Sequence, residues 1–384
     1  MFPEWTVLVG FYLGATIGSF LNMAIYRLPR KISFVDPAKS MCPSCKHSLG
    51  AADLFPIFSW LLLGGKCRYC KAKVSSRYLF VELLCGSLWG AIWWQYFIAS
   101  AQPATAIAFA AAAALLVLLS FIDWETFEIP DEVNALILVV GLVYHGFTGD
   151  FVAGVWGALW GWGILWGITL MGRVMFGKDA MGHGDIKLMR GVGAVVGAKL
   201  LVVAIMIAVF LGAVIGGTLA IVAKRQAAEA TSDEGEPPPP ESFKSLFLLG
   251  AVYALGIDIV ALFFPGIYRW LEKQLPNDDM EDEDFTPTWT HIPFGPYLAL
   301  GTIICMIFAR PLEHAVNEYL ENMGGARVQF QPHNEDGVER LRASAVSALA
   351  NCNNYGNDQL DRTLGTSRGT PWSNGLRDRG FWYE

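Results

Sequence analysis

Long apolar runs separated by short polar loops make up most of the chain before residue 310. Runs of about 20 apolar residues have the length that a helix needs to cross a bilayer. The stretch 187–223 is too long for one span, and Lys199, which follows Gly197, indicates a turn between a short span and a full one. We therefore expect an all-α polytopic membrane protein with about eight transmembrane helices, near 5–26, 79–99, 103–122, 132–148, 152–176, 187–198, 200–223 and 293–309.

Polar stretches divide the chain into seven expected parts. These are a first transmembrane helix at 1–26, a cytoplasmic CxxC…CxxC zinc-type domain at 27–78, a transmembrane core with the candidate catalytic residues at 79–225, an acidic Pro-rich linker at 226–242, an extra apolar segment with an acidic loop at 243–291, a further transmembrane helix at 292–310 and a polar, disordered tail at 311–384.

The first span and the extra apolar segment carry features that bear on their topology. The first run has no basic residues before it and no small-residue cleavage site after it, so we expect a retained span and not a cleaved signal peptide. Its Gly10, Gly14 and Gly18 fall on one helical face and suit close helix packing. The apolar stretch 244–271 contains Asp258 and could be a span, a broken hairpin or an interfacial helix. A full span would invert the helix that follows, so we expect a hairpin or a surface element.

The distribution of charge sets the expected orientation. The loop 27–78 carries ten Lys and Arg residues against Asp36 and Asp53, which places it in the cytoplasm by the positive-inside rule. Counting spans from there puts the loop 177–187 and the end of the span near 122 on the same side. The chain is 53% hydrophobic and only 16% charged, with a net charge of −7, and its acidic stretches lie away from the basic loop, so we expect no nucleic-acid partner.

Two aspartates, Asp123 and Asp185, stand where apolar runs meet polar loops. A carboxylate at a bilayer boundary is costly, so it usually has a function. Both are expected on the cytoplasmic side, where they would form an acid–base pair. In such a pair one carboxylate is ionised and takes a proton while the other is protonated and donates one; which one does which is left open because the proton belongs to the pair.

Four neighbours of the pair are candidate supporting residues. Gly182 and Gly184 allow a tight turn and let the backbone approach a substrate. Lys187 either biases the charge of Asp185 or extends to the interface. Asp131, which follows Pro130, is expected to cap the helix beginning at 132.

Two CxxC pairs lie in the basic loop. Cys42 and Cys45 form the first pair, and Cys67 and Cys70 form the second after a gap of 21 residues. This spacing is typical of a tetrahedral tetrathiolate zinc site, which is closed and therefore structural. A disulfide or redox pair is the alternative, but reduced thiols and a metal are favoured on the cytoplasmic side.

Five blocks of residues carry a resemblance to a known family. They are Gly18–Asn22 with Tyr26–Pro29, the two cysteine pairs with Ser59-Trp60 and Arg77-Tyr78, Ile122–Asp131, Gly182–Leu188 and Pro293–Pro296. In this order they resemble the type IV prepilin peptidases, GxGD-type aspartic proteases of bacterial inner membranes. The similarity covers roughly 10–225 and 292–309, whereas the stretch 226–291 and the tail beyond 310 are extra.

The resemblance implies a function. It implies an endopeptidase that removes the basic leader of type IV prepilins or pseudopilins at the cytoplasmic face, with Asp123 and Asp185 as catalytic residues. It also implies S-adenosylmethionine-dependent methylation of the new amino terminus, although no residues can be assigned to that cofactor. Glu82 matches an acidic position of the family, where support of the fold is favoured over contact with the methyl donor or substrate.

Two other functions are compatible with parts of the sequence. A non-enzymatic, zinc-anchored membrane assembly factor would tolerate replacement of both aspartates. A transporter would use them as a proton relay, but it would need acids deep in the spans, whereas these lie at span ends.

Overall fold

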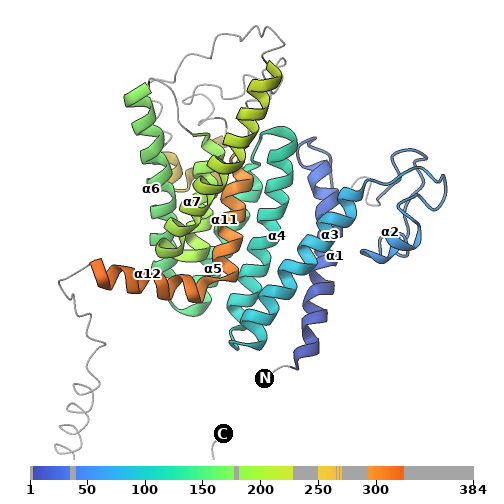
Figure 1. The fold of residues 1–384 in the computed structure, drawn as a ribbon, viewed down its shortest axis with the longest axis horizontal. Helices are drawn as coiled ribbons and strands as arrows, with labels where there is room; N and C mark the ends of the chain where they lie inside the picture. The colour runs from blue at the N-terminus through green and yellow to red at the C-terminus, as the bar shows by residue number, and fades with distance from the viewer. Residues whose placement is uncertain are drawn as a thin grey trace, which may run out of the picture. The chain divides into compact units, whose positions relative to one another are not determined.

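The computed structural model describes residues 3–34, 40–176, 181–227, 250–264 and 293–323, together with residues 266, 267 and 269. Within these residues the chain is mostly helical (Figure 1). The elements are η1 (Glu4–Thr6), α1 (Val7–Arg27), α2 (Phe58–Leu62), α3 (Ser76–Ile92), η2 (Trp93–Ile98), α4 (Pro103–Thr126), α5 (Asp131–Thr148), α6 (Phe151–Phe176), α7 (His183–Ala227), α9 (Ile257–Phe263), α11 (Gly295–Ile307) and α12 (Ala309–Met323).

Helix α4 lies in the middle of the bundle. It contacts α1 and α3 on one side and α5 and α11 on the other, as Figure 1 shows. Its core positions Ala112, Ala113, Leu116 and Leu119 are almost completely buried. Because protein interiors are close-packed, neighbours on both sides fix the position of this helix and of the polar residues in its last turn.

Small residues bring the other helices together. Gly14 of α1 lies against the backbone of Cys85 in α3, and Gly157 of α6 lies against Gly193 of α7. A side chain at either position would collide with the facing backbone, so glycine permits the close approach. Gly10 faces Trp93 of η2 and Gly18 faces Glu82 of α3, which confirms the packing role predicted for the glycine face of the first span.

Helix α7 consists of two arms joined by a kink. Gly197 has φ 76° and ψ 166°, values outside the helical region that glycine adopts without strain. The first arm begins beside the α4 terminus and the second arm returns alongside α11, where Gly301 packs on Ala204. The turn that Gly197 and Lys199 predict is therefore present.

Four helical stretches of the described residues are long and apolar enough to cross a membrane, or five if the bent pair α11–α12 is one span. These are Glu4–Arg27, Pro103–Thr126, Phe151–Met175 and His183–Gly216. Helix α3, with 17 residues, continues directly into η2 and is not counted by itself, α11, with 13, is shorter than a full span, and α7 counts once despite its kink. The chain thus has the helices of a membrane protein, and the number of eight spans stays a prediction.

The expectation of a disordered tail from 311 onward is wrong for its first part. Residues 309–323 form α12, which lies at 90° to α11. Its apolar side chains recur at helical spacing, from Leu312 through Val316 to Tyr319, on an otherwise polar helix. The rest of the tail, from 324 on, lies outside the described residues, as do residues 228–242 of the linker and 243–249 of the extra apolar segment, whereas residues 226 and 227 of the linker belong to α7.

The extra apolar segment forms two short helical pieces in its described part. Residues 250–254 and α9 pack on α5, α6 and α7. Asp258 makes a bidentate ion pair with Arg190 of α7, at 2.9 and 2.7 Å, and both side chains are nearly buried. At seven residues α9 is far too short to cross a bilayer.

Candidate active site

Asp123 occupies the last turn of α4. The helix ends because Phe127 adopts a left-handed conformation with φ 57°, and its N–H closes the turn on the carbonyl of Asp123 at 2.9 Å. The side chain of Asp123 points into the bundle, where only 4% of the residue is exposed. Burial of a carboxylate to this degree needs a structural or chemical reason.

Asp185 lies in the first turn of α7, and this end of α7 packs closely against the loop between α4 and α5. A side chain at Gly184 would lie 2.9 Å from the Cβ of Ile129, so only glycine lets the α7 terminus approach the α4–α5 loop. Gly182 meets no such obstacle, since a Cβ there would be 3.6 Å from the Asp185 carboxylate. The amide of Asn134 donates to the Gly184 carbonyl at 3.4 Å, which ties the same terminus to α5.

The two carboxylates share one environment. Asp123 and Asp185 interact electrostatically. Oδ2 of Asp123 and Oδ1 of Asp185 are buried, and neither has a hydrogen-bond partner within the described part of the chain. Like charges so close together cannot both ionise cheaply, and orphaned carboxylate oxygens are free to hydrogen-bond a water or a peptide group.

A third chain segment completes the site. The backbone of Gly295, the first residue of α11, lies against the Asp123 carboxylate, and a Cβ at that position would collide with Oδ2. The same Cβ would be 3.3 Å from Ile129, which also contacts Gly184. Ile129 therefore joins the termini of α7 and α11, and three segments distant in sequence converge on the aspartates.

The other candidate residues near the site have different partners from those expected. Pro130 is the N-cap of α5 and Asp131 is its first residue, so the expected capping role of Asp131 is wrong. The Asp131 carboxylate instead accepts two hydrogen bonds from Nζ of Lys187, at 2.8 and 2.9 Å. Lys187 thus ties α7 to α5 and also lies 4.8 Å from the ring of Tyr253.

The four loop cysteines form one cluster. Their sulfurs all lie within 4.8 Å of one another, and Cys42 and Cys70 are 3.8 Å apart. All four are free thiols in this structure. The backbone N–H of Cys45 lowers the pKa of the Cys42 thiol to about 6, whereas burial and the neighbouring thiols raise the pKa of Cys70 to about 11, so the fit to a metal rests on the geometry of the four sulfurs. The donor set fits a tetrahedral Zn²⁺ ion, whose Zn–S bonds are about 2.3 Å long.

The two cysteine pairs have matching local structures. In each, the first cysteine's N–H bonds a carbonyl five residues later, and its carbonyl accepts from the residue after the second cysteine. That residue, Lys46 or Lys71, has a positive φ of 57° or 59°. Repetition of this strained turn shows two equivalent knuckles that each present two sulfurs to the centre of the cluster.

Sequence reasoning missed two features of this region. It assigned no role to Gly295, although the residue belongs to one of the blocks that carried the family resemblance. It also missed an ion pair between Arg77, at the start of α3, and Glu125, in the last turn of α4. Their separation of 48 positions leaves no local signal, so only the fold reveals that this pair links the cysteine-bearing loop to the helix of Asp123.

Comparisons with known proteins agree with the resemblance. Residues 12–96 match the bacterial peptidase A24 N-terminal domain, and residues 110–217 match the type IV leader peptidase family. Proteins named prepilin leader peptidase/N-methyltransferase are similar over most of their length. The one from Stutzerimonas stutzeri is 34% identical over 56% of this chain and 81% of its own, and the one from Myxococcus xanthus is 31% identical over 76% and 87%. No solved structure matches the chain.

Proposed function

Because the chain belongs to the type IV leader peptidase family, we propose that Asp123 and Asp185 are the catalytic pair with which it removes the leader of type IV prepilins or pseudopilins. The chain is an enzyme with two activities, cleavage of the prepilin leader and N-methylation of the product. A non-enzymatic assembly factor is not supported by these relationships.

The chemistry of cleavage follows from the shared environment of the two carboxylates. One aspartate is ionised and removes a proton from a water molecule, which attacks the scissile carbonyl carbon. The other is protonated and donates a hydrogen bond to the carbonyl oxygen as negative charge develops on it. Collapse of the tetrahedral intermediate returns a proton to the leaving amine, and the pair ends with one proton, as it began.

One observation carries this proposal. The only two carboxylates at the converging termini of α4, α7 and α11 that leave buried oxygens without partners, within the described residues, are Asp123 and Asp185. The other nearby acid, Asp131, is satisfied by Lys187. Preorganised polar groups facing a reacting atom are the largest source of rate enhancement in most enzymes.

Substitution of each aspartate tests the proposal. Asp123→Asn and Asp185→Asn should abolish conversion of a prepilin to its shorter form on a gel, because the amide keeps the shape but cannot share a proton. Asp150→Asn is the matched control, since this exposed residue stands in the α5–α6 turn at the other end of α5. Normal processing by either site variant, with wild-type amounts in the membrane, would refute the assignment.

We further propose that the site faces the cytoplasm of a bacterial inner membrane. The support is the basic loop 27–78, which joins α1 and α3. Arg77 of this loop pairs with Glu125, two residues from Asp123, so the loop and the aspartates lie on the same side of the bundle. A prepilin enters the membrane with its basic leader on that side, where the pair would meet the cleavage point.

The cysteine cluster would hold one Zn²⁺ ion through Cys42, Cys45, Cys67 and Cys70. A four-thiolate site leaves no open coordination position, so the ion would stabilise the fold of the loop and take no part in peptide cleavage. Metal binding and folding are coupled in such small domains. The loop would then require its metal, whereas the aspartates are held by the helices of the bundle.

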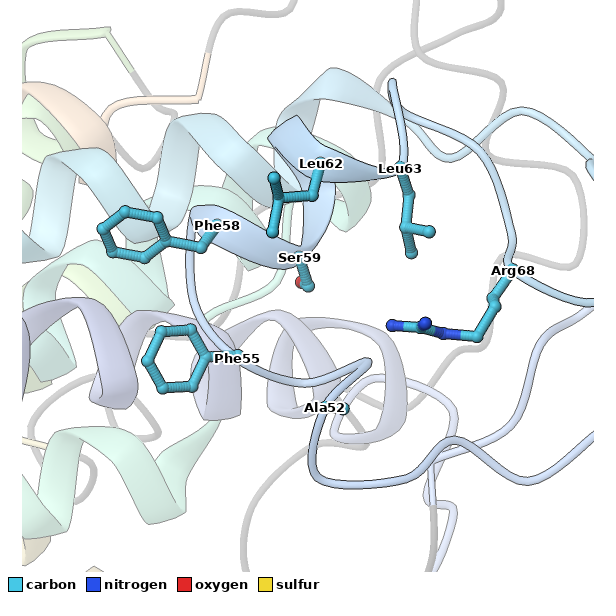
Figure 2. A pocket seen from close by; sticks show the side chains of 7 residues that line it. All are labelled: Ala52, Phe55, Phe58, Ser59, Leu62, Leu63 and Arg68. Carbon is cyan, nitrogen blue, oxygen red and sulfur yellow. The ribbon is translucent and has the colours of Figure 1, made fainter.

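The relatives' names imply S-adenosylmethionine as the methyl donor. Its sulfonium and amino groups are cationic and need acidic or polar partners. The apolar pocket in the cysteine-bearing loop, drawn in Figure 2, does not fit this cofactor. Its walls include Phe55, Phe58 and Leu62, and its one charged residue is the cation Arg68. We therefore assign the methyl donor no residues.

A further inference from the structure

The segment between the two cysteine pairs has an unusual surface. Residues 54–63 read Leu-Phe-Pro-Ile-Phe-Ser-Trp-Leu-Leu-Leu, with Ser59 as the single polar side chain. Five of these apolar residues are 40–84% exposed, and Leu62 is the most exposed of them. A contiguous apolar surface of this kind marks a site of contact with a membrane or another molecule.

The depth of this segment can be measured along the two helices that flank it. The ring of Phe55 lies 5.5 Å from that of Tyr12 in α1. Tyr12 precedes Arg27, the end of α1, by fifteen residues, so this contact lies along the helix and not at its end. The stretch Glu4–Arg27 is long and apolar enough to cross a membrane, so Phe55 contacts α1 within a candidate span.

A second contact places the following residue beside α3. The N–H of Ile57 donates to Oε2 of Glu82 at 2.7 Å. Glu82 is six residues into α3, or about 9 Å from its first residue. Figure 1 agrees, since α2, which begins at Phe58, lies alongside α1 and α3 and not beyond their ends.

Most of the segment's backbone N–H groups have partners within the protein. Hydrocarbon offers no hydrogen bonds, so each backbone N–H must find a partner in the protein. Pro56 has no N–H, and those of Ser59, Leu61 and Leu63 bond to carbonyls four residues earlier. Ile57 begins the turn with a positive φ of 65°, and its N–H bonds to Glu82. This contact gives the buried carboxylate of Glu82 a structural role.

The exposed apolar side chains of residues 54–63 extend the lipid-facing surface of α1. Leu8, Val9 and Leu13 of α1 are exposed beside Tyr12, on a helix that is apolar enough to span a membrane. The segment adds its own apolar side chains to that surface at the Tyr12–Phe55 contact. Hydrocarbon that covers the span therefore also covers the segment.

Figure 2 shows the hollow that this segment forms. It has a volume of about 320 Å³ and is bounded by Ala52, Phe55, Phe58, Ser59, Leu62, Leu63 and Arg68. Phe55 and Phe58 lie on one side and Arg68 on the other. The guanidinium is half-exposed and is held at 2.5 Å by Asp53, whose pKa the hydrogen bond from Arg68 holds below its usual range. The apolar walls of the hollow are complementary to a phospholipid acyl chain, and its charged rim is complementary to the headgroup above that chain.

We propose that residues 54–63 are a membrane-inserted anchor, covered by phospholipid acyl chains of the leaflet that faces the active site. The anchor enters the bilayer beside α1 and α3 and leaves it again before Cys67, and Glu82 fixes its turn. It holds the cysteine cluster at the membrane surface on the side where Asp123 and Asp185 lie. The proposal of an anchor rests on its contacts with α1 and α3, and it does not depend on which residues cleave the substrate.

Photo-crosslinking tests the proposal on the full chain in phosphatidylethanolamine–phosphatidylglycerol vesicles. p-Benzoylphenylalanine replaces Leu62, an exposed position where the fold should tolerate it, or Lys73, an exposed control position in the second cysteine knuckle. After irradiation, mass spectrometry measures phospholipid attached to the peptide that contains the probe. We expect at least about ten times more lipid adduct at 62 than at 73, the contrast between hydrocarbon and water.

Two results would overturn the anchor. One is an equal lipid yield at the two positions. The other is a crosslink from 62 to polypeptide, either an added prepilin or a second copy, without lipid adduct. Glu82 is tested in the same assay with the probe at 62. Glu82→Ala should lower the lipid yield toward that at 73, while Glu82→Gln, which keeps an acceptor oxygen, should retain it. An unchanged yield in Glu82→Ala would refute the role of this carboxylate.

Discussion

Gly295 offers the sharpest test of how the site is assembled. In Gly295→Ala the added Cβ would overlap the Asp123 carboxylate and lie 3.3 Å from Cδ1 of Ile129. The Asp123 side chain has little free space to move into, since the residue is 96% buried in a helix packed on both sides. Either the carboxylate or the start of α11 must therefore move by about an ångström, a displacement that costs an active site about 10²-fold in rate, or about 2.7 kcal/mol.

The assay is cleavage of a purified prepilin by the detergent-solubilised enzyme, with kcat/KM as the readout and thermal unfolding measured in parallel. Overpacking should also destabilise the fold by about 1–3 kcal/mol. Gly163→Ala is the matched control, because a Cβ at this position in α6 meets no atom within 4 Å. It should cleave normally and gain up to about 1 kcal/mol from helix propensity. A Gly295→Ala enzyme as active as the control would refute the close contact between α11 and Asp123.

Three further predictions concern the supports of the site. Purified protein should contain about one zinc ion per chain by elemental analysis, and Cys42→Ser should lose most of it; a metal-free wild-type chain with oxidised cysteines would favour the disulfide alternative. Asp258→Asn leaves the buried guanidinium of Arg190 without its ionic partner, so unfolding measurements should show a loss of about 3–5 kcal/mol, and a loss below about 1 kcal/mol would contradict the ion pair. Asp131→Asn should cost at most about 1 kcal/mol and leave cleavage measurable, because its pair with Lys187 is partly exposed; complete inactivation would instead place Asp131 in the chemistry.

The sequence predicted the elements whose signals are local. The apolar run before Asp123 became α4, and Gly197 with Lys199 marked the turn within α7. The spacing of the cysteines predicted a single four-sulfur cluster, and the sulfurs do converge. Each of these features depends on residues near one another in the chain, where periodicity and turn chemistry act directly.

Features that depend on distant contacts could not be predicted in this way. The bond from Ile57 to Glu82 joins residues 25 positions apart, and the Arg190–Asp258 pair joins residues 68 apart. The amphipathic face of α12, by contrast, was present in the sequence at Leu312 and Val316. That repeat is short, and the polar composition of the tail obscures its helical spacing.

Kinetics of the two aspartate variants and their combination test the central claim most directly. Asp123→Asn, Asp185→Asn and the double variant are compared for leader cleavage under single-turnover conditions, with equal amounts of folded enzyme. If the two carboxylates share one proton and act as a unit, each single change should cost about 10³-fold or more, and the double variant should be no slower than the slower single variant. A double variant slowed by the product of the two single losses, or a single variant that retains more than about a tenth of the wild-type rate, would contradict the account.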